Sequence, residues 1–185
     1  MSAASSSSEG RNPDPGGTDA DGEAVSHVSI EVRQRSHPLD RDRLTEFVLE
    51  LLRHRRQVGE LGFHFVSARE MARVNWDFLR HEGSTDVITF DHGSGKGRLH
   101  GECFISVPDA VGQAAEFGRP WTEELARYVI HGVLHLEGFD DLAPETRRVM
   151  KRHENRLVAW ASRRFDLGKF RRSPQAAGRR GGRKP

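Results

Sequence analysis

The sequence predicts an α+β fold, in which a small mixed four-stranded sheet packs with about five helices in the order βαβαββααα. Three observations support this prediction. Short segments in which apolar and polar residues alternate are typical of strands, as at Val28, Ile30 and Val32. Longer segments repeat apolar residues at three- and four-residue spacing, which is typical of amphipathic helices. Turns that contain Gly or Pro separate the two kinds of segment.

Each predicted helix begins at a residue that favours a first helical turn. Pro38, Pro108 and Pro144 have the fixed φ that suits the first helical position. Ser67 begins a capping box, and Thr122 is followed by acidic residues that suit the positive end of a helix. A glycine-rich stretch between the last two strands predicts a hairpin loop. Strands are expected over 28–32, 61–66, 86–90 and 101–107, and helices over about 38–57, 67–79, 108–118, 122–137 and 144–163.

Composition divides the chain of 185 residues into three parts. Residues 1–26 are rich in Ser, Gly, Pro and acidic residues, with one basic residue against five acidic ones, and predict a disordered acidic arm. A single folded domain is expected over 27–162. Residues 163–185 hold nine Lys and Arg against one Asp and predict a disordered basic tail.

Several classes of protein do not fit this sequence. No apolar run approaches the ~20 residues that a membrane-spanning helix needs. The N-terminal residues lack the basic start and apolar run of a secretory signal. Cys103 is the single cysteine, so no disulfide forms within the chain. We therefore expect a cytoplasmic protein with no membrane partner.

The segment from His131 to Asp141 has the strongest functional pattern in the chain. His131 and His135 are four residues apart on a predicted helix, so both imidazoles can reach one divalent metal at about 2.0–2.1 Å. Gly138 suits a left-handed helix end, and the turn would bring Asp140 and Asp141 back toward the histidines. We expect Asp141 to complete a His-His-carboxylate site that leaves one coordination position open, as in catalytic zinc sites. The alternative is two ordinary helix histidines before an ordinary glycine stop.

Gly132 argues against a peptidase. Zinc peptidases of the HExxH type carry a glutamate at this position, and that glutamate is the general base. Glycine cannot transfer a proton, although it lets a backbone or a substrate approach the helix closely. A divergent peptidase would need another carboxylate near the metal, and Glu137 and Asp140 are the candidates.

Polar residues between the second predicted helix and the third predicted strand are further site candidates: Asn75, Arg80, Thr85 and Asp86. Arg80 has the planar guanidinium that clamps a phosphate, and it can equally cover the end of a helix. Thr85 and Asp86 are also typical of an ordinary turn. His100 and Glu102 begin the fourth strand, where they either face the metal cleft or lie on the surface.

Basic residues near the C-terminus predict contact with a polyanion. Arg163, Arg164, Arg171 and Arg172 are the residues we expect to bind RNA, because basic clusters release counterions from a nucleic acid when they bind it. The alternative is a solvated tail that only aids solubility. The tail supports a nucleic-acid partner but does not establish one.

Three segments in the same order resemble the YbeY family of metal-dependent endoribonucleases. In chain order, these segments are VNWDFLRHEGSTDVITF, LHGECFISVPDA and HGVLHLEGFDD. The resemblance covers about residues 27–160. It implies a single α+β domain that binds one divalent metal ion, and zinc is the metal we expect. It also implies cleavage of single-stranded RNA, with no DNA expected, and a role in the maturation of the 3′ end of small-subunit (16S) rRNA and in ribosome quality control. The small ribosomal subunit is the partner that this resemblance implies.

The resemblance carries over residue by residue, with two departures. His131 and His135 match the first two metal ligands of the family, whereas Asp141 stands where the family usually has a third histidine. A carboxylate makes the ligand set harder, which bears on the identity of the metal. Many members also have an arginine directly after the aromatic residue that corresponds to Phe78 of the VNWDFLRHEGSTDVITF segment. Here Leu79 occupies that position and Arg80 follows it, so Arg80 is the predicted phosphate contact.

One reading without catalysis stays open from the sequence. The chain could be a ribosome-assembly factor in which a structural metal stabilises the fold and the basic tail binds rRNA. Four protein ligands and no open coordination position would favour that function.

Overall fold

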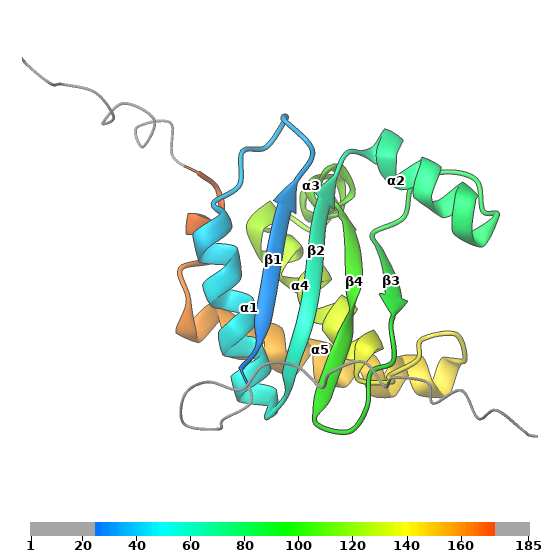
Figure 1. Cartoon of the computed structure of the whole chain (residues 1–185). Helices are drawn as coiled ribbons and strands as arrows, with labels where there is room; N and C mark the ends of the chain where they lie inside the picture. Colours follow the sequence, from blue (N-terminus) through cyan, green and yellow to red (C-terminus); the bar gives the residue numbers. More distant parts are fainter. Residues whose placement is uncertain (1–24, 173–185) are drawn as a thin grey trace, which may run out of the picture.

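The computed structural model describes residues 25–172 of the chain (Figure 1). Its elements follow the predicted order, with one π-helical turn and one 3-10 helix added. They are β1 (His27–Val32), α1 (Arg41–Arg55), β2 (Val58–Val66), α2 (Ala68–Val74), η1 (Asn75–Leu79), β3 (Val87–Asp91), β4 (Arg98–Ser106), α3 (Val107–Glu116), α4 (Trp121–Leu136), α5 (Pro144–Arg164) and η2 (Leu167–Phe170). The predicted α+β class and the mixed four-stranded sheet are confirmed.

The sheet has the strand order β1-β2-β4-β3. β1, β2 and β4 are parallel, and β3 is antiparallel to β4, with Val87 opposite Ile105. β2 lies in the middle of the sheet and is buried over most of its length, whereas β1 and β3 form the two edges. This order separates the two edges, so groups at β1 and groups at β3 lie on opposite sides of the domain.

The two faces of the sheet are covered very differently. α1, α4 and α5 lie behind the sheet (Figure 1), and the main hydrophobic core fills the space between them and the strands. On the front, α2 covers only one end, where Met71 and Val74 pack with Val66 and Ile88. Most of the front face is therefore free of helices. Behind the sheet, α4 has the most buried residues among the described helices.

Gly132 is where α4 comes closest to the sheet. A Cβ atom at this position would lie 2.8 Å from the sulfur of Cys103 on β4, well inside normal contact distance. The glycine therefore allows the close approach that the sequence indicated, and the neighbour it admits is the sheet. Position 132 faces the core and not the side of α4 that carries His131.

The basic tail begins later than the sequence predicted. α5 continues to Arg164, and η2 follows with Leu167 and Phe170, which are 7% and 2% exposed. Phe170 packs against Phe47 of α1 with ring centroids 5.2 Å apart, so apolar contacts hold this basic segment in the domain. The described structure thus continues to Arg172, ten residues past the expected boundary at 162. The predicted disorder of residues 1–24 and 173–185 concerns residues outside the described part of the chain.

Among residues 25–172, no helix is both long enough and apolar enough to cross a membrane.

Candidate metal centre

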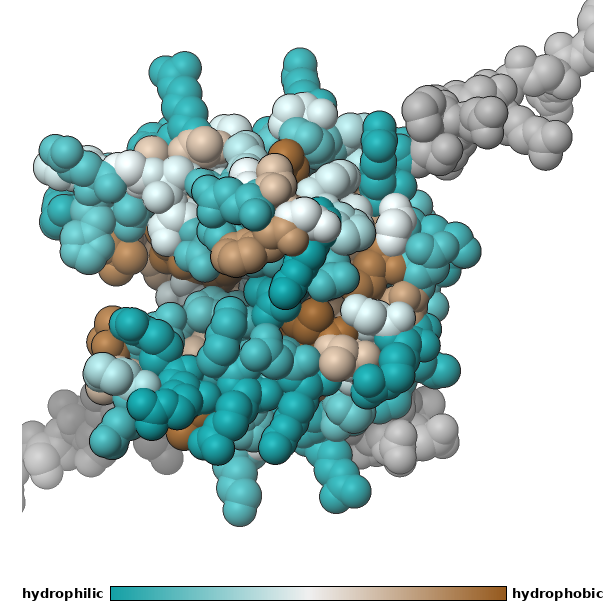
Figure 2. All heavy atoms as spheres, turned by 180° about the vertical axis from the view of Figure 1, so that it is seen from behind, coloured by the Kyte–Doolittle hydropathy of each residue, from teal (hydrophilic) through white to brown (hydrophobic). Residues whose placement is uncertain are grey.

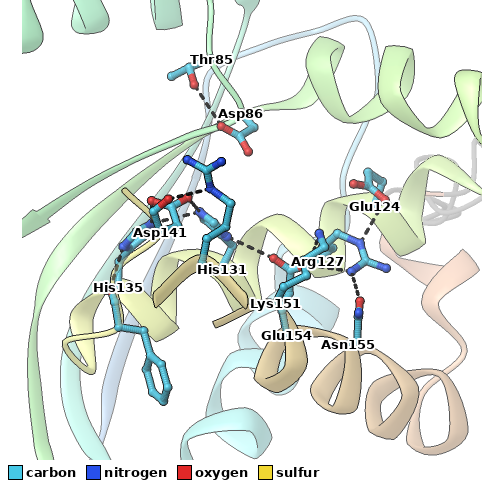
Figure 3. Close-up of polar contacts among 12 residues, drawn as sticks. Thr85, Asp86, Glu124, Arg127, His131, His135, Asp141, Lys151, Glu154 and Asn155 are labelled. Atoms are coloured by element: carbon cyan, nitrogen blue, oxygen red, sulfur yellow. Dashed lines mark hydrogen bonds and ion pairs between the residues drawn. The ribbon is translucent and has the colours of Figure 1, made fainter. Parts of the chain in front are cut away.

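α4 presents His131 and His135 on one side, one helical turn apart. Their Nε2 atoms are 3.0 Å apart, and their rings meet edge to face. The opposite side of α4 packs on the sheet through apolar residues, so the helix cannot rotate the histidines away. Both rings therefore direct one nitrogen at the same point (Figure 3).

The turn after α4 brings a carboxylate to this point. Gly138 has φ +87°, the left-handed conformation that ends the helix and reverses the chain. Asp141 then places Oδ2 3.7 Å from Nε2 of His131 and Oδ1 3.9 Å from Nε2 of His135. One ligand atom from each of the three residues lies within 4.8 Å of the others, and no other group of this kind occurs in residues 25–172.

Asp140 has a different task from its neighbour. Its carboxylate accepts hydrogen bonds from the amide of Leu142 and the hydroxyl of Thr146, both at 3.2 Å, at the start of α5. Arg147 donates to the backbone oxygen of Asp141 at 2.8 Å, which fixes the turn and leaves the Asp141 side chain free to face the histidines. Of the two adjacent acidic residues, Asp141 is the one in position to bind a metal.

The outer nitrogen of each ring is held by a group that only accepts hydrogen bonds. Nδ1 of His131 lies 3.1 Å from Oε2 of Glu154, and Nδ1 of His135 lies 3.1 Å from the backbone oxygen of Phe139. Each Nδ1 therefore carries the proton, and each Nε2 presents a lone pair. Two lone pairs 3.0 Å apart repel each other unless a cation lies between them. A divalent metal fits this arrangement, and the nitrogen and oxygen donors are those that zinc accepts.

Glu154 is a buried carboxylate that stays charged. Arg127 and Lys151 donate to its Oε1 at 2.6 and 2.7 Å, while His131 holds its Oε2 (Figure 3). Burial by itself would raise the pKa of Glu154, but the hydrogen bonds from its three neighbours outweigh burial and lower the pKa to about 2. A carboxylate behind a histidine ligand fixes the ring and strengthens its basicity.

His135 favours the neutral form that a ligand needs. Burial lowers the pKa of His135, and a proton on His131 would lower it further. Protons therefore compete less with a metal for this ring. The two histidines are thus prepared for a metal by different means, one through a charged acceptor and the other through burial.

One side of the centre is open. The Asp141 side chain is 38% exposed, and a cavity of about 500 Å³ adjoins His131. Asp86, Arg119 and Lys151 are among the residues that line this cavity. Seen from behind, a notch separates the part of the molecule that carries α2 from the part that carries the turn between α4 and α5 (Figure 2). A metal bound by three residues here would keep a position for water or substrate.

Some of the other predicted residues lie near the metal centre, and others lie away from it. Asp86 lines the cavity beside His131, and Thr85 donates to its Oδ1 at 3.0 Å. Asn75 is buried and holds the backbone oxygen of Gly83 at 3.0 Å, so it shapes the loop before β3. Arg80 ends η1 with φ +57° and is exposed. Among the described residues, no hydrogen bond or ion pair joins Arg80 to the cluster, so its phosphate contact stays a prediction.

His100 and Glu102 lie on the front face of the sheet, away from the metal centre. Neighbouring residues on β4 alternate between faces, and Gly101 and Cys103, on either side of Glu102, both face α4. Glu102 contacts Nε2 of His64 at 3.2 Å, and the His100 ring packs beside His92. The sequence left open whether His100 and Glu102 face the metal cleft. The alternation of side chains along β4 places both on the other face of the sheet.

Sequence reasoning missed Glu154 and its two cationic partners. Glu154 follows Met150 by four residues and precedes Leu157 by three, so it stands in the buried stripe of α5. A carboxylate within an apolar stripe was the available signal. Its partner could not be named, because His131 is on another helix and 23 residues away.

A family model described as Endoribonuclease YbeY matches residues 29–161, from β1 to near the end of α5. The chain belongs to this family. Proteins named Endoribonuclease YbeY are similar along more than half of the chain. The one from Bacteroides fragilis is 39% identical over 106 residues, which is 57% of this chain and 76% of the relative. The one from Chlorobaculum parvum is 39% identical over 99 residues, or 54% and 70%.

A solved structure supports the fold. The solution structure of TM1509 from Thermotoga maritima matches with a TM-score of 0.53 and 23% sequence identity, over 74% of this chain and 91% of that protein. At this identity the likeness concerns the fold alone.

Proposed function

We propose that this protein is a metal-dependent endoribonuclease that cleaves single-stranded RNA and uses His131, His135 and Asp141 as its metal ligands. The observation that carries the proposal is the pair of Nε2 atoms 3.0 Å apart, each freed by an acceptor on its own Nδ1 and faced by the Asp141 carboxylate. Membership of the YbeY family supports RNA as the substrate. The substrate we propose is the 3′ end of small-subunit rRNA, which makes the small ribosomal subunit the partner and the cytoplasm the place of action.

Zinc is the metal we propose. Two imidazoles and one carboxylate are a ligand set that catalytic zinc sites use. When bound, a divalent metal of this kind polarises a phosphate oxygen and lowers the pKa of a bound water. The residues of the chain hold and orient the site: Glu154 and Phe139 fix the two rings, and Asp141 supplies negative charge from the open side.

The surroundings of the centre suit a phosphodiester better than a peptide. Position 132 faces Cys103 in the core, so even a glutamate there would not reach the metal. The side chain of Glu137, one alternative peptidase base, is buried and ion-paired with Arg55. Asp140, the other, is occupied by hydrogen bonds at the start of α5. Arg119 and Lys151 beside the cavity are cations that can meet phosphate.

An RNA cleavage assay tests this function. Zinc-loaded wild type should cut single-stranded small-subunit rRNA internally, and chelation should remove the activity in step with the metal. His131→Ala from an identical preparation controls for a contaminating nuclease. Arg80→Ala should cut more slowly and keep its metal, because its proposed partner is phosphate. Equal RNA cleavage by wild type and His131→Ala would refute the enzyme and leave a metal-stabilised assembly factor in its place.

A further inference from the structure

A strongly basic cavity lies at the β1 edge of the domain, opposite the edge formed by β3. It has a volume of about 940 Å³ and is bounded by the end of β1, the start of α1 and the segment that follows α5. Its lining holds six cationic side chains, Arg35, Arg41, Arg43, Lys169, Arg171 and Arg172. Only Asp40 and Asp42 oppose them, so the lining carries a net charge of six minus two, or +4. It shares no residue with the cavity beside His131.

The backbone that carries Arg171 and Arg172 is fixed on the start of α1. Phe170 is buried in the core, and its backbone oxygen accepts from the amide of Asp40 at 2.9 Å. Arg171 forms a β-bridge with Leu39, and the amide of Arg172 donates to the backbone oxygen of Pro38 at 2.9 Å. α1 and this C-terminal segment lie side by side beyond β1 (Figure 1). The cavity is therefore part of the folded domain.

A buried glutamine fixes the opposite wall. Gln34 is 6% exposed, and its amide nitrogen donates to the backbone oxygen of His37 at 2.6 Å. Its amide oxygen accepts from the amide of His37 at 2.9 Å and from the hydroxyl of Ser36 at 3.0 Å. These bonds hold the loop that carries Arg35. A ligand that binds the arginines would therefore not have to order the loop or the C-terminal segment first.

Much of the positive charge is available to a ligand. Within residues 25–172, Arg35, Arg41, Arg171 and Arg172 take part in no ion pair, while Arg43 pairs with Glu46 and Lys169 with Asp166. Asp40 caps α1 by accepting from the amide of Arg43 at 3.1 Å, which occupies one of the two opposing carboxylates. The N-terminus of α1, a helix of 15 residues, adds to the positive potential.

We infer that this cavity binds the sugar-phosphate backbone of the RNA substrate at a distance from the metal centre. The inference rests on the proposed function and adds a second contact for the same substrate. Guanidinium groups from three separate segments suit several phosphates of one strand, since each group can bind a phosphate oxygen pair. Backbone contacts of this kind position a nucleic acid without reading its sequence. The cavity would thus hold a long strand while the metal centre cuts it.

The sequence predicts RNA contacts for four arginines near the C-terminus, whereas this inference retains only Arg171 and Arg172, so the four provide a matched pair of variants. Arg171→Glu/Arg172→Glu changes the lining of the cavity. Arg163→Glu/Arg164→Glu makes the same change of charge at the exposed end of α5, outside the lining. Full-length, zinc-loaded proteins should be compared for binding of a single-stranded rRNA fragment over a range of salt concentrations. Rapid mixing allows binding to be read before turnover.

The cavity variant should bind RNA about tenfold more weakly than the control variant. Its affinity should depend less on salt, with a slope smaller by about 1.4, because each lost phosphate contact on a single strand contributes about 0.7. Metal content should not change, because the cavity shares no residue with the cluster of His131, His135 and Asp141. Asp42→Asn, which removes an opposing carboxylate, should bind RNA more tightly than wild type.

The outcomes separate this inference from the proposed function. Equal affinities and equal salt slopes for the two double variants would refute the inference that the cavity binds RNA. An acidic protein partner would then be its occupant. If RNA binding depends on Arg171 and Arg172 but the protein never cleaves RNA, the result would support RNA binding in the cavity and refute the proposed nuclease activity.

Discussion

Two groups of histidines and carboxylates lie on opposite sides of the sheet, and only one of them has the geometry of a metal site. On the front face, His64 has a carboxylate at each ring nitrogen, with Glu31 at Nδ1 and Glu102 at Nε2, both at 3.2 Å. Behind the sheet, each ring of His131 and His135 has an acceptor at one nitrogen and leaves the other free. A metal ligand needs that free nitrogen.

The difference shows that histidine count is a poor guide to a metal site. Glu102 also lies 3.7 Å from His92, so the front face is as rich in ligand types as the centre on α4. Yet its carboxylates pair with rings one by one, whereas the three ligand atoms of His131, His135 and Asp141 converge. Convergence comes from the helix repeat and the glycine turn, which a strand does not provide.

The largest difference in metal content should appear when one histidine ring is removed from each group. His135→Ala should lose its metal, because two remaining ligands hold zinc poorly, and RNA cleavage should disappear with it. His64→Ala, the control on the front face, should keep a full complement of metal. Elemental analysis of proteins purified without added zinc measures both. Full metal occupancy in His135→Ala would break the comparison.

The next largest effect should be a difference in metal affinity between variants of the two adjacent acidic residues. Asp141→Ala should weaken metal binding strongly, whereas Asp140→Ala should lose only the hydrogen bonds that begin α5. Asp141→His should retain metal, since imidazole is also a ligand, with a shift toward softer ions. Competition with a coloured chelator gives the three affinities. An unchanged affinity in Asp141→Ala would remove this residue from the site.

The buried acceptor should have an intermediate effect. Glu154→Gln keeps the size of the side chain but removes the charge behind His131, and metal affinity should fall by about 10–100-fold. Glu102→Gln is the same substitution in the front-face group and should leave metal affinity unchanged. Calorimetric zinc titration of both variants is the measurement. Matching affinities would mean that Glu154 only stabilises the fold.

The smallest effect concerns stability along α4. Gly132→Ala forces a Cβ toward the sulfur of Cys103 and should cost about 1–3 kcal/mol of unfolding free energy. Gly112→Ala on α3, where a Cβ meets no atom within 4 Å, should instead gain about 0.5–1 kcal/mol. Urea unfolding of the metal-free variants compares them. A stabilised Gly132→Ala would show that position 132 does not face the sheet.

Most of the fold could be predicted from the sequence because its signals are local. The alternation at Val28, Ile30 and Val32 and the capping box at Ser67 each act within one element. The second helix was harder. The sequence predicts one helix over 67–79, but the helix changes to a π-helical turn after Val74, and Phe78 is 64% exposed. Contact between the Phe78 and Phe90 rings, at 4.7 Å, depends on tertiary structure and has no local signal.

The candidate site shows the same division between local and distant information. His131, His135 and Asp141 lie within eleven residues, so helix geometry and one glycine were enough to predict that they meet. Glu154 comes from the next helix, and the burial of Leu167 and Phe170 depends on contact with α1, more than a hundred residues away in the chain. Composition alone made that C-terminal segment look unfolded.

X-ray absorption at the zinc edge tests the central claim most directly. Zinc-loaded wild type should show two imidazoles at about 2.0–2.1 Å with oxygen in the remaining positions, and His135→Ala, if it can be loaded, should show one. No sulfur should appear near 2.3 Å, because burial raises the pKa of Cys103 to about 12 and keeps it a thiol. A sulfur ligand, or the same number of imidazoles in wild type and His135→Ala, would contradict this account of the site.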